Sequence, residues 1–186
     1  HKIIMRISII VSILFFIVLG CQSEKKYDAK TVAASNFSVE IPAFLNKTNI
    51  LHEEATLQYQ NLIREYYTVV IEEPIDEFQA IVDIEPYFNE NYTPDLDGYT
   101  KLIMGNILDN IEVKEQSEID TTEINGLPCR KFEISGKVDG MDIYYNIAYL
   151  QGKTKFYQVV NWTLLGNKKD YATSMHQIIA SFKEKN

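Results

Sequence analysis

The chain has 186 residues, with 18 Lys and Arg against 26 Asp and Glu, so its formal net charge is −8 at pH 7. A chain of this length suffices for one domain with a hydrophobic core, because single domains cluster at roughly 100–150 residues. Phosphate backbones and anionic headgroups repel an acidic protein. The composition therefore argues against nucleic-acid binding and against electrostatic adhesion to membranes.

The first 20 residues have the order of an export signal. Lys2 and Arg6 precede an apolar run over residues 7–19, which is too short to cross a bilayer comfortably, since a membrane helix needs about 20 apolar residues. Residues 18–21, Val-Leu-Gly-Cys, resemble the bacterial lipobox, whose Cys takes up a diacylglyceryl group and becomes the mature N-terminus. The motif predicts that residues 1–20 are a lipoprotein signal peptide and that Cys21 carries the lipid.

The mature protein is then attached to a membrane through acyl chains, such as palmitate, on Cys21. Residues 1–20 hold two of the basic and none of the acidic residues, so their removal makes the net charge −10. Gln22 follows the Cys in place of the Asp that retains some lipoproteins in the inner membrane. We therefore expect a lipid-anchored protein of the bacterial cell envelope, in the outer membrane rather than the inner one.

Residues 21–35 are predicted to be the lipidated Cys and a flexible tether, because they are polar and small and follow no period. A single domain is predicted over residues 36–186. With Cys21 lipidated, Cys129 has no partner for an internal disulfide, and its place at the start of a strand pattern favours a small buried thiol.

In the first half of the domain, alternation of apolar and polar residues predicts a strand over residues 37–41. Two further strands are predicted at residues 57–59 and 66–71, joined around residues 60–61. A short helix follows Pro74, which suits the first helical position, with Ile75, Phe78 and Ile81 on one face.

A longer helix is predicted over residues 93–111, with Thr93 as N-cap and Pro94 at the first helical position. Its apolar stripe has the spacing i, i+4, i+8, i+12 and is widened by Leu102; it consists of Tyr99, Ile103, Ile107 and Ile111. A stripe of this width indicates packing against a core.

Three strands and a helix are predicted in the second half. The strands cover residues 130–135, 143–149 and 156–164, with an Asp139-Gly140 hairpin between the first two. Phe156, Val160 and Trp162 share a face of the last strand, and we expect Trp162 to be buried there. The closing helix has its apolar stripe at i, i+4, i+7, i+11: Tyr171, Met175, Ile178 and Phe182. Hairpins with helices between and after them predict an α+β fold, in which helices cover an antiparallel sheet.

Three segments of this half carry a family resemblance. They are residues 125–134 (Asn-Gly-Leu-Pro, then Arg130, Phe132 and Ile134), 138–145 and 156–164. Together they resemble bacterial lipoproteins of the PsbP-like family, which share their fold with PsbP of photosystem II and with a Ran-GTPase release factor. The resemblance implies an α/β/α sandwich with a central antiparallel sheet, used for protein binding or assembly. It implies no catalytic residues, and no metal-ligand motif of the photosynthetic branch can be matched to this chain.

No catalytic or metal-binding constellation can be inferred from spacing. The domain has two histidines, His52 and His176, and neither has a Ser or Cys partner at a recognisable distance. Acidic residues at 72–77 and 95–97 are explained by helix N-termini, and the latter depart from the calcium-loop pattern. We therefore expect no enzymatic activity and no cofactor or metal.

Two pairs of adjacent tyrosines are candidate partner-binding residues: Tyr66 and Tyr67, and Tyr144 and Tyr145. In a strand, one member of each pair points inward and the other outward, and exposed aromatic side chains are enriched among binding hot spots. The leading hypothesis is a lipoprotein whose domain binds another protein through the outward tyrosines. The alternative is a module that binds a small apolar ligand or lipid in a cleft between sheet and helix.

Overall fold

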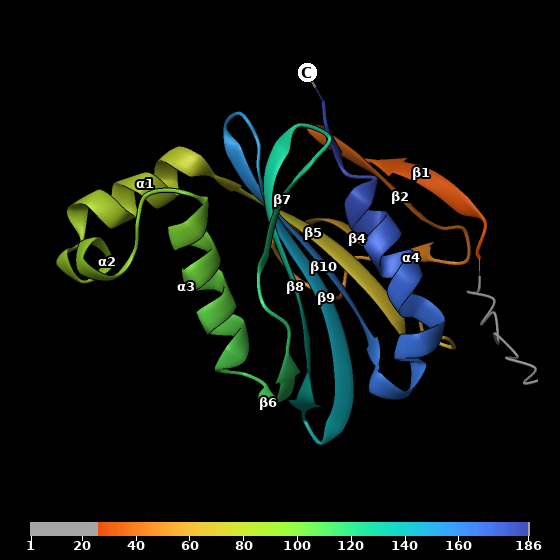
Figure 1. Cartoon of the computed structure of the whole chain (residues 1–186). Helices are drawn as coiled ribbons and strands as arrows, with labels where there is room; N and C mark the ends of the chain where they lie inside the picture. The colour runs from red at the N-terminus through yellow and green to blue at the C-terminus, as the bar shows by residue number, and fades with distance from the viewer. Residues whose placement is uncertain (1–25, 186) are drawn as a thin grey trace, which may run out of the picture.

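The computed structural model describes residues 26–185, in which helices cover both faces of a large antiparallel sheet (Figure 1). The predicted signal peptide and Cys21 lie outside the described residues. The eight-stranded sheet has the order β3-β4-β5-β10-β9-β8-β6, and β7 pairs with the other half of β8. Its strands are β3 (Asn46–Lys47), β4 (Ala55–Asn61), β5 (Tyr66–Pro74), β6 (Glu112–Gln116), β7 (Asp120–Ile124), β8 (Leu127–Val138), β9 (Met141–Gln151) and β10 (Lys155–Leu164).

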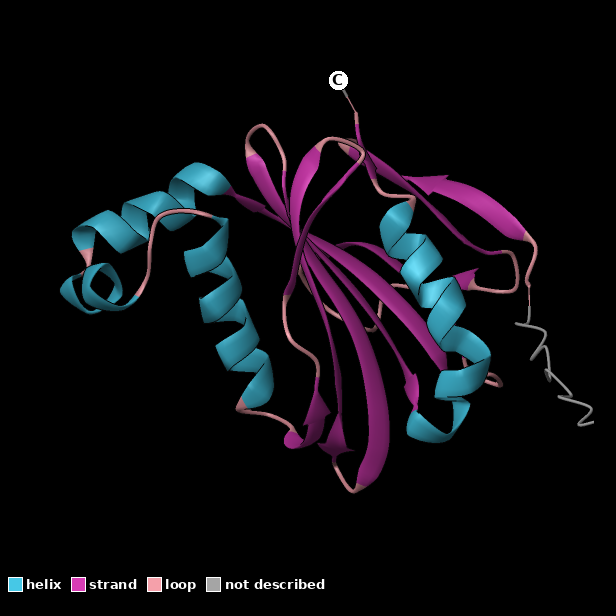
Figure 2. Ribbon diagram, viewed as in Figure 1, coloured by secondary structure: helices cyan, strands magenta, loops and turns pink. Residues whose placement is uncertain are grey.

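The helices divide into two groups, one on each face of this sheet (Figure 2). The first group is α1 (Ile75–Ile84), α2 (Pro86–Asn91) and α3 (Leu96–Leu108). The other face carries α4 (Lys168–Ala180), which follows a 3-10 turn at Leu165–Asn167. A small three-stranded sheet joins α4 on that face: β1 (Ala29–Ala33), β2 (Phe37–Pro42) and β11 (Lys183–Glu184). The predicted sandwich of helices around an antiparallel sheet is therefore confirmed.

Strand β1 departs from the predicted tether over residues 21–35. Ala29–Ala33 pairs antiparallel with β2 through all five of its residues. The segment alternates exposed and half-buried positions, so a short polar edge strand with Thr31 and Val32 satisfies its backbone by pairing. Its composition, read alone, does not distinguish such an edge strand from a linker.

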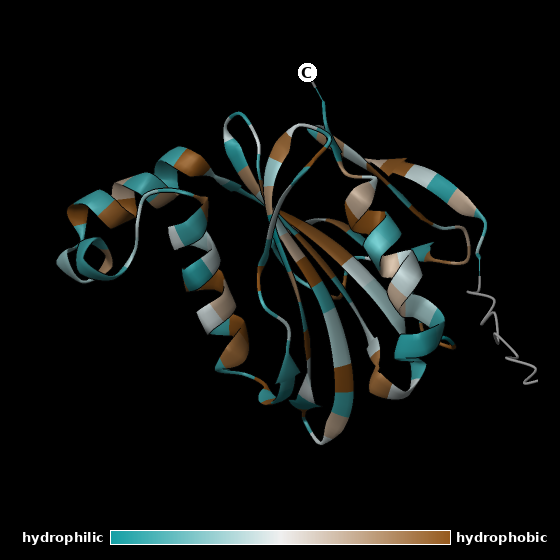
Figure 3. Ribbon diagram, viewed as in Figure 1, coloured by the Kyte–Doolittle hydropathy of each residue, from teal (hydrophilic) through white to brown (hydrophobic). Residues whose placement is uncertain are grey.

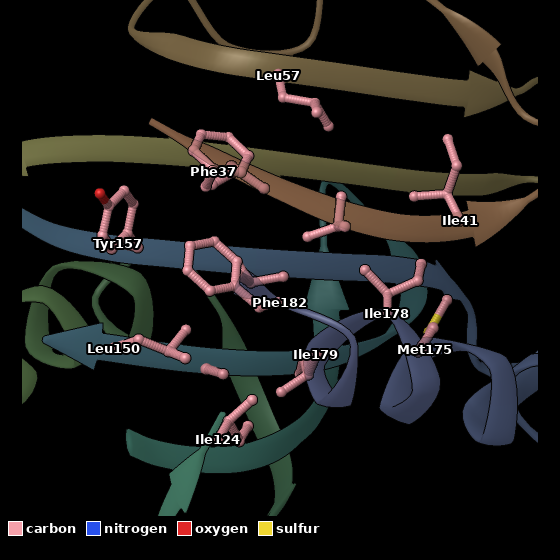
Figure 4. Packing of buried hydrophobic residues seen from close by; sticks show 14 of the residues in the cluster. Phe37, Ile41, Leu57, Ile124, Leu150, Tyr157, Met175, Ile178, Ile179 and Phe182 are labelled. Carbon is pink, nitrogen blue, oxygen red and sulfur yellow. The ribbon is translucent and has the colours of Figure 1, made fainter. Parts of the chain in front are cut away.

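The core on the α4 face joins the small sheet to the large one (Figure 4). Phe182 follows α4 and stacks on Phe37 of β2 with ring centroids 5.3 Å apart, and it lies 4.9 Å from the Tyr157 ring of β10. Met175 and Ile178 of α4 are fully buried against the sheet, as predicted. This cluster holds the two ends of the described chain against the central strands.

A row of polar side chains crosses the sheet beneath α4. Thr68 donates to the Oδ1 of Asn161 at 2.6 Å, and the Asn161 amide approaches the Oδ1 of Asn146 at 3.4 Å. His176 of α4 continues the row, since its Nδ1 lies 3.2 Å from the Asn146 amide nitrogen and its Nε2 lies 2.9 Å from Glu133. Buried polar groups cost free energy unless they are paired, so this row depends on the observed strand alignment.

The sheet edges contain the elements that the sequence does not predict. Strand β6 is exposed at all five positions, and β3 and β11 have two residues each. Their residues lack the apolar alternation on which strand prediction depends. The β4–β5 turn also lies later than predicted, at residues 62–65 rather than 60–61.

Candidate binding cleft

A cleft of about 520 Å³ lies between the large sheet and α3. Its sheet wall comes mainly from β5, β9 and β10, its helix wall from the C-terminal half of α3, and its rim from the loop before β4. Figure 3 shows the apolar C-terminal half of α3 beside the sheet. Most of the lining side chains are apolar: Leu51, Val69, Ile71, Ile103, Ile107, Ile111, Val138, Tyr145, Val160 and Trp162.

An aromatic row crosses three neighbouring strands at one end of the cleft. Trp162 of β10 is aligned with Tyr67 of β5 on one side and with Tyr145 of β9 on the other. Its ring stacks on Tyr67 with centroids 5.2 Å apart, and the Tyr145 ring lies at 6.3 Å. All three side chains are only half-buried. The row therefore leaves part of each aromatic side chain accessible to a ligand.

A polar cluster closes the opposite end of the cleft. The Glu73 carboxylate oxygen Oε2 accepts a hydrogen bond from the Tyr99 hydroxyl and one from the Gln158 amide at 3.0 Å. Burial, followed by the nearby Glu73 charge, raises the pKa of Tyr99 far above its usual range. The cleft thus combines apolar walls with the carboxylate of Glu73, which the buried Tyr99 and the Gln158 amide hold in place.

The position of α3 is set by its N-terminus. Asp95 is the N-cap, because its Oδ1 accepts hydrogen bonds from the backbone N–H groups of Asp97 and Gly98 at 3.0 Å each. The helix begins at Leu96, and Thr93 instead donates to the Asp95 side chain, so the predicted N-cap is wrong by two residues. Asp97 also pairs with Arg130 of β8 at 2.6 Å. These contacts attach the N-terminal end of α3 to β8.

The structure separates the four tyrosines predicted as partner-binding residues. Tyr66 and Tyr144 are fully buried on the α4 face, where the Tyr66 hydroxyl lies 3.0 Å from that of Ser174. Burial raises the pKa of both phenols. Tyr67 and Tyr145 occupy the α3 face and flank Trp162. Of the four, these two are the ones a partner or ligand can reach.

Trp162 was predicted as a core residue, and this prediction is wrong. It shares its face with Phe156 and Val160, as expected, but only Phe156 is fully buried. The reason is that Phe156 packs against Phe78 of α1 and Tyr99 of α3, whereas Trp162 lines the cleft. Ile103 and Ile107 of α3 are likewise half-buried and line the cleft, as does Ile111, which follows the helix because α3 ends at Leu108 and not at the predicted residue 111. The sequence could have indicated this cleft only if the order of the strands were known, because the aromatic residues that line up beside α3 come from three different strands.

The remaining residues considered for chemistry are Cys129, His52 and the clusters of possible metal ligands. Cys129 is buried, and burial raises the pKa of its thiol to about 12, which makes it unreactive. His52 lines the rim of the cleft. Within residues 26–185, no group of three or more His, Cys, Asp or Glu side chains is arranged to hold a metal ion. In the same range, no helix has the length and apolar character needed to cross a membrane.

Solved structures with the same architecture come from bacterial proteins of low sequence identity. The cyanobacterial PsbP of Synechocystis sp. PCC 6803 is 10% identical, with a TM-score of 0.57 over 90% of this chain and 99% of that chain. LpqN of Mycobacterium tuberculosis, described as involved in cell envelope biogenesis, is 10% identical, with a TM-score of 0.52 over 86% and 91%. A protein of Bacteroides thetaiotaomicron is 10% identical, with a TM-score of 0.52 over 87% of this chain and 50% of that chain.

These likenesses define the class of fold: an antiparallel sheet between helices, as in PsbP. The chain has a PsbP-like fold, as its sequence resemblance implied. No protein-family model and no curated protein matches the sequence. None of these three similar proteins is described by an enzymatic activity.

Proposed function

We propose that this protein is a lipid-anchored, non-enzymatic binding protein of the bacterial cell envelope, and that its cleft binds an apolar or amphipathic small molecule. The cleft carries the proposal. Its volume of about 520 Å³ falls in the range of roughly 300–1,000 Å³ that is typical of ligand sites, and most of its lining is apolar, with Glu73 and Gln158 hydrogen-bonded to each other in its wall. Envelope placement is supported by the lipobox at Cys21 and by the likeness in fold to LpqN.

The chemistry of the cleft defines the class of ligand. The stacked Tyr67 and Trp162 rings favour a flat or aliphatic apolar body. The Glu73 carboxylate favours a group that donates hydrogen bonds, such as a hydroxyl, amide or ammonium. Native mass spectrometry of protein extracted from its own membrane identifies a retained molecule by mass.

Filling the cleft should abolish binding of a neutral apolar dye. Ile107 of α3 is half-buried and lines the cleft, so Ile107→Trp places an indole where the ligand would lie. We expect N-phenyl-1-naphthylamine, which fluoresces on leaving water, to bind this variant at least about tenfold more weakly than wild type, a loss of about 1.4 kcal/mol. Fluorescence titration measures the change.

Ile81→Trp is the matched control, because Ile81 is 46% exposed on α1 and does not line the cleft. It should bind the dye as wild type does. Equal dye affinity in all three proteins would contradict the assignment of the cleft as the binding site.

The anchor should depend on a single thiol. Two or more acyl chains hold a protein on a membrane stably, whereas one gives marginal binding. Cys21→Ser should therefore move the protein from the membrane fraction to the soluble fraction. Metabolic labelling with an alkyne analogue of palmitate should mark wild type and leave the variant unmarked; unlabelled wild-type protein would refute the anchor.

A protein partner is the second candidate. The observation that favours it is the half-buried aromatic row of Tyr67, Trp162 and Tyr145, since Tyr and Trp are enriched at the centres of interfaces. Replacing Tyr67 and Tyr145 by Ser should then remove a co-purifying protein. A retained small molecule in the mass spectrum favours the ligand, whereas a co-purifying protein with no bound small molecule favours the partner.

A further inference from the structure

The β4–β5 hairpin displays two large apolar side chains at its tip. Ile63 is 97% exposed and Leu62 is 63% exposed. The tip is a built turn: the Asn61 side chain accepts from the Arg64 N–H at 3.0 Å and donates to the Phe44 carbonyl at 2.9 Å, and Glu65 has a φ of 49°. Adjacent apolar side chains held outward on an ordered turn form an apolar patch of the kind that marks protein or membrane contact sites.

The start of the described chain lies against the same hairpin. The Arg64 guanidinium lies 4.3 Å from the centroid of the Phe44 ring and 5.6 Å from that of Tyr27, and the Tyr27 ring packs on Phe44 at 5.0 Å. In Figure 1 the end of β5 next to this hairpin lies on the same side as β1, whereas α1 and α2 lie at the opposite end. The described chain therefore begins beside the β4–β5 hairpin.

The length of chain before this point limits how far the hairpin can be from a bilayer. Lys26 is five residues from Cys21, and an extended chain spans at most about 3.6 Å per residue, or about 18 Å in total. A domain tethered so closely must keep this end near the membrane. Leu62 and Ile63 are exposed at this end.

The charges at this end suit lipid headgroups despite the acidic composition of the whole chain. Arg64 and Lys26 are exposed beside the tip. The Asn167 amide approaches the Arg64 carbonyl at 3.5 Å, which places the first turn of α4, with exposed Lys169, next to the hairpin. Acids lie here as well: Asp28 is exposed near Lys26, Asp170 lies in the first turn of α4, and Glu65 accepts a hydrogen bond from the Tyr67 hydroxyl at 2.6 Å.

From these observations we infer that the β4–β5 hairpin is a membrane-contact element, whose Leu62 and Ile63 insert into the lipid interface while Arg64 and Lys26 lie at headgroup level. The inference rests on the proposed anchor at Cys21. It implies a fixed orientation, with β1, the hairpin and the start of α4 toward the bilayer and with α1 and α2 away from it.

Depth measurement with a spin label tests this orientation. Cys129 is fully buried, and in the mature protein the Cys21 thiol is acylated, so a cysteine introduced at the surface is labelled selectively. Mature protein with Ile63→Cys is reconstituted into vesicles of phosphatidylethanolamine and phosphatidylglycerol. We expect collisions with oxygen to exceed those with a water-soluble nickel chelate, at a depth of about 5–10 Å below the headgroups.

Ile84→Cys is the matched control, because Ile84 is 74% exposed at the end of α1, on the far side of the molecule. Its label should collide with the nickel chelate as freely as in solution. A label at position 63 with the same aqueous accessibility as one at position 84, in protein that sediments with the vesicles, overturns the inference.

A second experiment measures the depth of the same two labels without acylation. In it, a hexahistidine segment replaces residues 1–21 and holds the protein on vesicles that contain nickel-chelating lipid. If wild type takes up no lipid, the anchor fails, yet the depth of position 63 in this tethered protein still decides the role of the hairpin. Immersion there supports the inference, and aqueous exposure overturns it.

Discussion

Phe182→Ala should lower the free energy of unfolding by about 3–5 kcal/mol, the usual cost of removing a large buried aromatic ring. Phe182 is fully buried, stacks on Phe37 at 5.3 Å and contacts Tyr157, so its loss opens a cavity where β2, β10 and the segment after α4 meet. In a domain whose total stability is about 5–15 kcal/mol, this is a large fraction. Urea denaturation of the isolated protein measures the change.

Tyr87→Ala is the control for the loss of an aromatic ring. Tyr87 is 66% exposed on α2, and surface substitutions of this kind usually change stability by no more than about 0.5 kcal/mol. A Phe182→Ala protein as stable as the Tyr87→Ala protein would mean that the small sheet does not pack on the large one as described.

Two Gly→Ala substitutions in α3 should change the free energy of unfolding in opposite directions. An added methyl at Gly98 would lie 2.6 Å from the backbone nitrogen of Thr93 and 2.7 Å from its carbonyl carbon, and backbone atoms cannot rotate away. Gly98→Ala should therefore destabilise the domain by about 1–3 kcal/mol, as overpacking does. Gly105 has no atom within 4 Å of the added methyl, and in a helix interior Gly→Ala stabilises by roughly 0.5–1 kcal/mol.

Thermal melting of the two variants compares them directly within one helix. Gly105→Ala should melt above wild type and Gly98→Ala below it. If Gly98→Ala melts at or above wild type, the close approach of α3 to the chain before it is wrong, and with it the wall of the cleft.

The strands and helices with strong apolar periods could be predicted from sequence, because burial itself imposes the period. The central strands β5, β8, β9 and β10 and the helices α3 and α4 fall where the pattern indicates. The turn at Asp139 and Gly140 also matches, with φ angles of 48° and 82° that Asp-Gly pairs adopt readily. Elements at the edges could not be found, since an exposed strand such as β6 carries no period.

The cleft was predicted only as an alternative, between sheet and helix and lined by tyrosines, without the particular strands and helix that form its walls. Alternation shows which residues of β5 share a face with Tyr67 and which residues of β10 share a face with Trp162. It does not show that β5 and β10 are neighbours or that these two residues are opposite each other. Those facts depend on contacts between residues about 90 positions apart. The burial of Trp162 likewise depends on where α3 packs on the sheet, which alternation within one strand does not show.

The polar row beneath α4 also specifies the cleft on the opposite face of the sheet. Thr68, Asn161 and Asn146 each immediately follow or precede a member of the aromatic row: Tyr67, Trp162 and Tyr145. A strand that slipped by two residues would leave the amides of the polar row buried and unpaired, so the hydrogen bonds on one face penalise misalignment of the rings on the other. Hydrogen bonds on the α4 face thus stabilise the alignment of the aromatic row on the α3 face, through residues that do not line the cleft. Substitutions in this hidden row should alter binding without changing a single side chain of the cleft.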